Sequence, residues 1–108
     1  MSKRIFPIIK ISNKSNKELG NLIFTYDDCK YPRGVKSLKE NSQKEVKIAN
    51  KSIEYDKNLF LIYRDKKGNK KSYIIEENFN KNYDYEITLD VYDVSDYGEL
   101  EFNIKKIQ

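Results

Sequence analysis

The sequence predicts an all-β fold, a sandwich of two antiparallel sheets with about seven strands, formed as a single domain over residues 1–108. Apolar and polar residues alternate over short segments, as in strands that bury one face. Turn-forming Asp, Asn, Gly and Pro separate these segments. No segment has the longer periodicity of an amphipathic helix. This pattern is typical of sandwiches and barrels.

The longest apolar run, Leu59–Tyr63, pairs in the predicted fold with Lys70–Glu76. Between them, a type I turn over Lys66 and Lys67 and a left-handed Gly68 predict a tight hairpin. The expected facing pairs are Tyr63–Lys71, Leu61–Tyr73 and Leu59–Ile75. Phe60 and Ile74 make the opposite face apolar as well, so we expect this hairpin inside the layered structure and not at its rim.

The strands before this hairpin are predicted at Arg4–Ser12, Leu19–Tyr26, Val35–Leu38 and Glu45–Ala49. Pro7 has no amide hydrogen to donate to a ladder, which predicts an edge or a bulge for the first strand. The segment Asp27–Gly34 is expected to be irregular. Its single cysteine, Cys29, is expected to be a buried or half-buried thiol without a reactive environment.

After the hairpin, the segment Glu77–Asp84 is predicted to be a polar loop that contains Phe79 and Tyr83. The last two strands alternate most regularly, with the apolar faces Tyr85, Ile87, Leu89, Val91 and Leu100, Phe102, Ile104. We expect them to form a hairpin closed across Asp93–Gly98. In the expected register Val91 faces Leu100, Asp90 faces Glu101 and Tyr92 faces Glu99.

One segment carries a resemblance to a known class of domain. Leu38-Lys39-Glu40-Asn41-Ser42-Gln43-Lys44-Glu45-Val46-Lys47-Ile48 is similar to the Leu-x-Pro-Gly-Glu-Ser-x-x-Val-x-Ile turn and strand of many bacterial immunoglobulin-like domains. Glu40 replaces the Pro and Asn41 replaces the Gly, although Asn tolerates the left-handed conformation better than most residues. The Cys-Trp-Cys signature is absent. The resemblance implies an immunoglobulin-like sandwich and transfers no functional family or active site.

Composition excludes several classes of enzyme. The chain has no histidine and one cysteine, which excludes Ser-His and Cys-His catalysis and zinc sites with several Cys or His ligands. Its four glycines form no phosphate-binding loop. The acidic residues of 90–99 recur every third position, unlike the alternate ligands of an EF-hand loop. We therefore predict a non-enzymatic protein with no catalytic residues, no metal and no cofactor.

The expected location is the bacterial cytoplasm. A lone cysteine suits a reducing compartment, and neither a signal peptide nor a transmembrane segment is visible. The abundance of Lys, Asn, Ile and Tyr indicates an AT-rich bacterial or phage genome. We expect no membrane partner.

The net charge of +4 is unevenly distributed along the chain. Residues 1–51 carry 12 Lys/Arg against 5 Asp/Glu, whereas residues 52–108 carry 9 against 12. Such asymmetry bears on partners more than on fold. Two rival binding surfaces follow, one acidic and one basic.

The first is an acidic, tyrosine-containing sheet face that we predict to bind another protein. Its residues are Asp90, Tyr92, Asp93, Asp96, Tyr97, Glu99 and Glu101. Like charges that face each other across strands are unfavourable, and either a cationic partner or lysines on a neighbouring strand would relieve them. The matching hypothesis is a small accessory, inhibitor or immunity-type protein, or an assembly subunit that pairs through an edge strand.

The alternative is a nucleic-acid-binding β-barrel. Its contact residues are the lysines at the tip of the central hairpin, Lys66, Lys67, Lys70 and Lys71. Lysines beside surface tyrosines can track phosphates and stack on bases. Arginine is scarce, and no RNA-binding aromatic motif is present, so we rank this function second.

Overall fold

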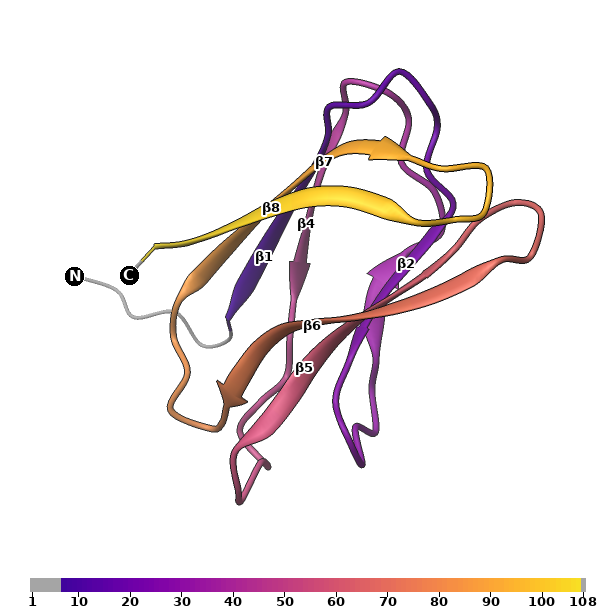
Figure 1. The fold of residues 1–108 in the computed structure, drawn as a ribbon. Coiled ribbons are helices and arrows are strands. Elements are labelled where there is room, and N and C mark those ends of the chain that lie inside the picture. The colour runs from indigo at the N-terminus through magenta and orange to yellow at the C-terminus, as the bar shows by residue number, and fades with distance from the viewer. Residues whose placement is uncertain (1–6, 108) are drawn as a thin grey trace.

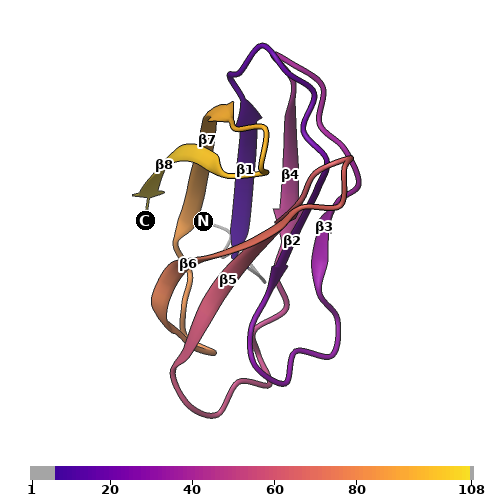
Figure 2. The ribbon, with the colours of Figure 1, turned by 45° about the vertical axis from the view of Figure 1, so that its right-hand side comes forward.

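The computed structural model describes residues 7–107. These residues form eight strands and no helix, arranged as two sheets (Figures 1 and 2). The strands are β1 (Ile8–Asn13), β2 (Asn21–Thr25), β3 (Arg33–Val35), β4 (Gln43–Lys47), β5 (Lys57–Arg64), β6 (Lys70–Phe79), β7 (Glu86–Val94) and β8 (Leu100–Ile107). The all-β, two-sheet prediction is confirmed. The structure has eight strands where about seven were expected. The short strand predicted at Val35–Leu38 lies instead at Arg33–Val35, where β3 pairs with β2, and Leu38 forms only an isolated bridge to Leu19.

One sheet has the strand order β4-β1-β7-β8 and the other β3-β2-β5-β6. All pairs are antiparallel except β1–β7, which is parallel. The prediction of purely antiparallel sheets is therefore wrong for this pair. Five other strands separate β1 from β7 along the chain, so no tight turn imposes an antiparallel arrangement on them.

The prediction of an edge position for the first strand is also wrong, because β1 is paired on both sides. Pro7 lies just before β1, so its missing N–H leaves the pairing of residues 8–12 with β4 intact. Its carbonyl accepts a hydrogen bond from the amide of Ile48 at 3.0 Å. Residues 4–6 of the predicted strand lie outside the described residues.

The core lies between the two sheets and follows the predicted alternation. Each sheet contributes the alternate residues of its strands, among them Ile9, Ile11, Leu22, Phe24, Leu59, Leu61, Tyr63, Ile87, Leu89 and Val91, which are all at most 1% exposed. Cys29 is half-buried against this core, as expected.

The polar loop predicted after the central hairpin is wrong in part. Strand β6 continues to Phe79, which is fully buried, and Tyr83 is only 7% exposed. The Phe79 ring lies 5.9 Å from that of Tyr26 and 4.9 Å from that of Tyr83, which in turn lies 5.2 Å from Tyr85. Phe79 and Tyr83 stand among polar residues, so the sequence pattern did not indicate their burial. An aromatic ring has enough apolar area to be buried even without apolar neighbours in the sequence.

The central hairpin has the predicted turn and most of the predicted register. Gly68 has φ 93° and donates its amide to the carbonyl of Asp65 at 3.1 Å. Tyr63 faces Lys71 and Leu61 faces Tyr73. At Leu59 the register fails, because a bulge places Glu76 and not Ile75 opposite it.

The expected position of this hairpin is wrong for one of its strands. β5 is internal to its sheet, but β6 lies at the edge. The molecule has two layers, so the outer face of the hairpin has no covering layer within residues 7–107. Ile74 on that face is 52% exposed.

Candidate binding surfaces

Asp90, Asp93 and Glu101 project from the outer face of their sheet, but in a register that differs from the predicted one. A bulge at Tyr92 shifts the β7–β8 register, so Asp90 faces Asn103, and Asp93, not Asp90, faces Glu101. Val91 faces Phe102 and not Leu100. The extra residue reverses the side on which the following side chains project. The expected register of this hairpin is wrong for that reason.

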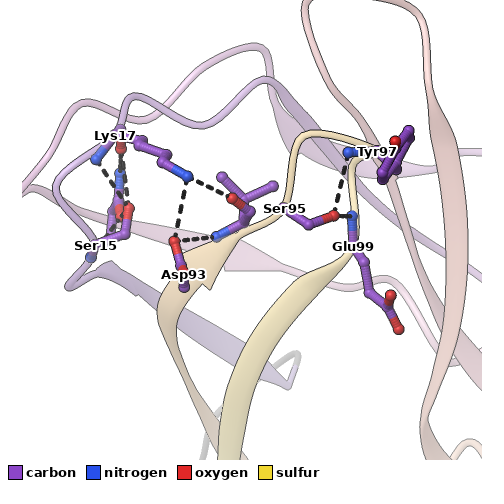
Figure 3. A network of polar contacts seen from close by, with 8 residues as sticks. Ser15, Lys17, Asp93, Ser95, Tyr97 and Glu99 are labelled. Atoms are coloured by element: carbon purple, nitrogen blue, oxygen red, sulfur yellow. Dashed lines mark hydrogen bonds and ion pairs between the residues drawn. The ribbon is translucent and has the colours of Figure 1, made fainter.

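Lysines of the β1–β2 connection compensate two of these acids. Lys14 Nζ lies 3.5 Å from Asp90, which is 7% exposed, and 5.8 Å from the centroid of the Tyr92 ring. Lys17 Nζ lies 3.5 Å from Asp93 and donates a hydrogen bond to the carbonyl of Val94 at 2.8 Å (Figure 3). The internal compensation that the sequence left open is therefore present for Asp90 and Asp93.

A buried polar turn positions Lys17. The Asn13 Oδ1 atom accepts hydrogen bonds from the amide and the hydroxyl of Ser15, at 3.0 and 2.6 Å. The Asn13 Nδ2 group donates to the carbonyl of Lys17 at 2.8 Å and to that of Leu38 at 2.9 Å. Because these groups satisfy one another, the loop is fixed against β7 and its lysine is directed at Asp93 (Figure 3).

The remaining predicted acidic residues lie at the end of the β7–β8 hairpin. Ser95 Oγ accepts hydrogen bonds from the amides of Tyr97 and Glu99, at 3.2 and 3.0 Å (Figure 3). Tyr97 is 77% exposed. Asp96, Glu99 and Glu101 make no ion pair with the described residues. What remains of the acidic surface is a hairpin tip.

The basic tip adjoins this acidic tip. Asn69 Nδ2 donates to the carbonyl of Asp96 at 3.4 Å, and a Cβ on Gly98 would lie 3.0 Å from the Cβ of Asn69. Lys66 forms an ion pair with Glu18. Hydrogen bonds from Asn69 hold the pKa of Asp65 below its ordinary value. Lys67, Lys70 and Lys71 are exposed. The two predicted surfaces therefore merge into one end of mixed charge.

A third surface, which the sequence analysis did not single out, is a groove of about 690 Å³ between β3 and β4. These strands are the edges of the two sheets on the same side of the sandwich (Figure 2). The β3–β4 groove is lined by Arg33, Gly34, Glu45, Val46, Lys47 and Ala49.

The backbone of β4 presents unpaired groups at this groove. The amide of Ile48 bonds to the carbonyl of Pro7, and the amide of Asn13 bonds to the carbonyl of Ser42. Since bonding alternates along an antiparallel pair, Lys44 and Val46 also bond to β1. The N–H and C=O groups of the intervening residues, Gln43, Glu45 and Lys47, point away from β1 and out of the free edge of the sheet.

On the other side of the groove, β3 lies close against β2. A Cβ on Gly34 would lie 2.0 Å from the carbonyl oxygen of Leu22, so only glycine fits at this approach. Arg33 faces Phe24 across the pair and so projects from the inner side of its sheet at the groove. Its side chain is exposed, and it makes no ion pair within residues 7–107.

Side-chain contacts close the opposite side of the sandwich. Tyr73 on β6 accepts the amide of Leu100 on β8 at 2.8 Å, and its ring meets that of Phe102 edge to face at 5.1 Å. Glu76 Oε2 pairs with Lys106 Nζ at 2.9 Å and accepts the Tyr83 hydroxyl at 2.8 Å. The sandwich is thus closed at β6–β8, and a groove lies on its other side at β3–β4.

Two further features bear on the class of site. The described residues contain no cluster of three or more His, Cys, Asp or Glu side chains able to hold a metal ion. No helix with the length and apolar character of a membrane span occurs among them.

Comparisons with known proteins support the fold alone. No protein family and no curated protein matches the chain. Among solved structures, an NMR structure of a protein from Eubacterium rectale is similar, with 12% identity and a TM-score of 0.56. The match covers 96% of this chain and 92% of that one. At this identity the likeness establishes a common arrangement of strands and transfers no function.

Proposed function

We propose that the protein is a non-enzymatic binding module that accepts an extended segment of another protein along the free edge of β4. The observation that carries this proposal is the row of outward-facing backbone groups on Gln43, Glu45 and Lys47 beside the β3–β4 groove. Strand addition at an exposed sheet edge is a recurrent mode of peptide recognition. It matches the expectation of an accessory, inhibitor or immunity-type protein, or of an assembly subunit, that pairs through an edge strand.

The groove favours β4 over the other edges. β3 has three residues, β6 is interrupted by a bulge, and the first outward amide of β8 is already bonded to Tyr73. An added strand on β4 would also place an inward-facing side chain beside Val46, which lines the groove together with Ala49. Main-chain bonds then contribute affinity, and the groove contributes selectivity.

A proline substitution tests this proposal. Glu45→Pro removes an amide that points along the free edge of β4, so the β1–β4 ladder remains intact. Ser72→Pro is the matched control, because the amide of Ser72 points along the free edge of β6. Proteins captured from a bacterial lysate are quantified for wild type and both variants, and binding of each purified candidate is then measured by calorimetry.

We expect at least one candidate to lose about tenfold or more in affinity with Glu45→Pro and to bind Ser72→Pro like wild type. Candidates that bind all three proteins equally would refute the proposed edge. Circular dichroism and thermal melting establish beforehand that both variants are folded.

Nucleic-acid binding through Lys66, Lys67, Lys70 and Lys71 remains a prediction, as does cytoplasmic location. The carboxylates of Glu18, Asp65 and Asp96 lie beside the tip and oppose a phosphate backbone. At the β3–β4 groove, likewise, no feature favours a nucleic-acid base over a peptide. Protein binding therefore stays our first proposal.

We further infer an immunoglobulin-like relationship for the first six strands. The order β3-β2-β5-β6 matches the C′-C-F-G sheet of such domains, and the antiparallel pair β1–β4 matches strands B and E. The β7–β8 hairpin then occupies the place of strand A, with β7 parallel to β1. This correspondence supports the resemblance seen at Leu38–Ile48 and carries no function.

A further inference from the structure

We infer that the segment bound on β4 is acidic, with a carboxylate placed on Arg33. This inference rests on the proposed function and names the chemistry of its partner. It comes from the charge around the β3–β4 groove, from the position of Arg33 and from the alternation of side chains along an added strand.

Among the residues that line the groove, Arg33 and Lys47 are cations and Glu45 is an anion. β3, the residue that follows it and β4 together carry four cations, Arg33, Lys36, Lys44 and Lys47, against one anion, Glu45. All five side chains are exposed, and none makes an ion pair within residues 7–107. Lys10, Lys14, Lys17, Lys57, Lys66 and Lys106 each have an acidic partner. The cations beside the groove have none within residues 7–107, as is also true of Lys67, Lys70 and Lys71 at the hairpin tip. The groove therefore carries a net positive charge that no ion pair compensates.

Arg33 is the cation whose side chain projects from the inner side of its sheet. Arg33 faces Phe24, whose side chain is buried, so both project from the inner side of the sheet. Val46 also faces inward, from the opposite rim, and is 6% exposed. An inward-facing residue of an added strand therefore meets apolar surface from Val46 and Ala49 and a guanidinium from Arg33.

Alternation turns this geometry into a sequence pattern for the partner. Inward-facing positions recur at every second residue of a strand. The segment should carry an apolar residue over Val46, with Asp or Glu two residues away against Arg33. A guanidinium binds a carboxylate through two parallel hydrogen bonds, which fixes geometry as well as charge.

Selection from a library of random linear peptides, each about nine residues long, tests this inference on the full chain. The immobilised baits are wild type, Arg33→Glu, Glu45→Pro and the control Ser72→Pro. We expect wild type and Ser72→Pro to enrich peptides with an acidic residue two positions from an apolar one. Arg33→Glu should lose these peptides, and Glu45→Pro should lose them as well.

Synthetic versions of the enriched peptides then give the quantitative result. Replacing the acidic residue by its amide should weaken binding about tenfold or more, and Arg33→Lys, which keeps the charge but loses the paired hydrogen bonds, should give an intermediate loss. A fluorescent single-stranded oligonucleotide without peptide is measured alongside, across a salt series.

The outcomes separate the inference from the function on which it rests. Peptides lost with Glu45→Pro but without an acidic preference, and unaffected by Arg33→Glu, would overturn the acidic partner and leave edge pairing in place. Enrichment that is identical on Glu45→Pro and wild type would overturn the proposed function itself. Oligonucleotide binding abolished by Arg33→Glu would assign the groove to nucleic acid and overturn both.

Discussion

At the scale of single residues, three tyrosines bury their rings in the core and satisfy their hydroxyls there. Tyr26, Tyr63 and Tyr83 are buried with their hydroxyls bonded, to the carbonyl of Ala49, the amide of Gly20 and the carboxylate of Glu76. Burial raises the pKa of Tyr26 to about 12, and raises that of Tyr63 as well. Tyrosines thus contribute to the core beside its Ile, Leu and Val residues, with their hydroxyls satisfied.

Phe79 provides a direct test of that core. Its ring is fully buried between Tyr26 and Tyr83, so Phe79→Ala should leave a cavity and lower the free energy of unfolding by about 3–5 kcal/mol. Tyr55→Ala is the control, since Tyr55 is 76% exposed and should change stability by less than about 0.5 kcal/mol. Urea denaturation followed by circular dichroism measures both. Similar effects for the two variants would contradict the burial of Phe79.

Glu76 makes stability depend on pH. Partial burial alone raises the pKa of Glu76, but hydrogen bonds from Lys106 and Tyr83 outweigh it and hold the pKa below its ordinary value. A carboxyl with a lower pKa in the folded state contributes stability above its unfolded pKa and loses it as the pH falls through the folded value.

We therefore expect wild type to lose stability on acidification below about pH 4.5, and Glu76→Gln to lose less over the same range. At neutral pH, Glu76→Gln should be less stable than wild type by about 1–2 kcal/mol, because the charge-assisted bond to Lys106 is lost. Urea midpoints measured across the pH range test this. Glu77→Gln, an exposed neighbour, should follow the wild-type profile, and equal pH dependence of the Glu76→Gln and wild-type proteins would exclude this role.

At the scale of elements, the turn at Asn41 leads into β4, the strand that borders the groove. Asn41 has φ 59°, the left-handed conformation expected for a residue that replaces glycine in the resembled motif. Its amide bonds to the carbonyl of Asn13 at 2.8 Å, which attaches the turn to β1. Asn41→Gly should therefore be neutral or slightly stabilising, whereas Asn41→Val should cost about 1–2 kcal/mol. Thermal melting compares the two, and a tolerated valine would mean that the turn adopts another conformation.

The elements also show which features the sequence could predict. Alternation located the strand cores other than that of β3, and Gly68 and Asn41 marked their turns, because these signals depend on neighbours in the chain. The bulges opposite Leu59 and at Tyr92 were missed, because no local residue type requires them. One inserted residue was enough to place Asp93, and not Asp90, opposite Glu101.

The whole molecule explains why the groove was missed. β4 lies at an edge because the β7–β8 hairpin pairs with the other side of β1 and not with β4. That hairpin follows β4 by about forty residues in the sequence, so no local pattern predicts the edge. The excess of positive charge in residues 1–51 was visible, but its concentration around β3 and β4 needed the topology. Lys14 and Lys17 were likewise visible, and only the fold placed them beside Asp90 and Asp93.

The sandwich as a whole has one side closed by side chains and one side open, and amide hydrogen exchange should distinguish them. Along β4, the amides of Lys44 and Val46 bond to β1, while those of Glu45 and Lys47 face the groove. We expect slow exchange for the first pair and fast exchange for the second, measured by NMR on the free protein. On β8, the amide of Leu100 should be protected by Tyr73 although it also faces outward.

Binding of an acidic peptide should then slow exchange at Glu45 and Lys47 without changing Ser72 on the opposite edge. Uniform protection along β4 in the free protein would mean that this edge is already covered, and strand addition there would be ruled out.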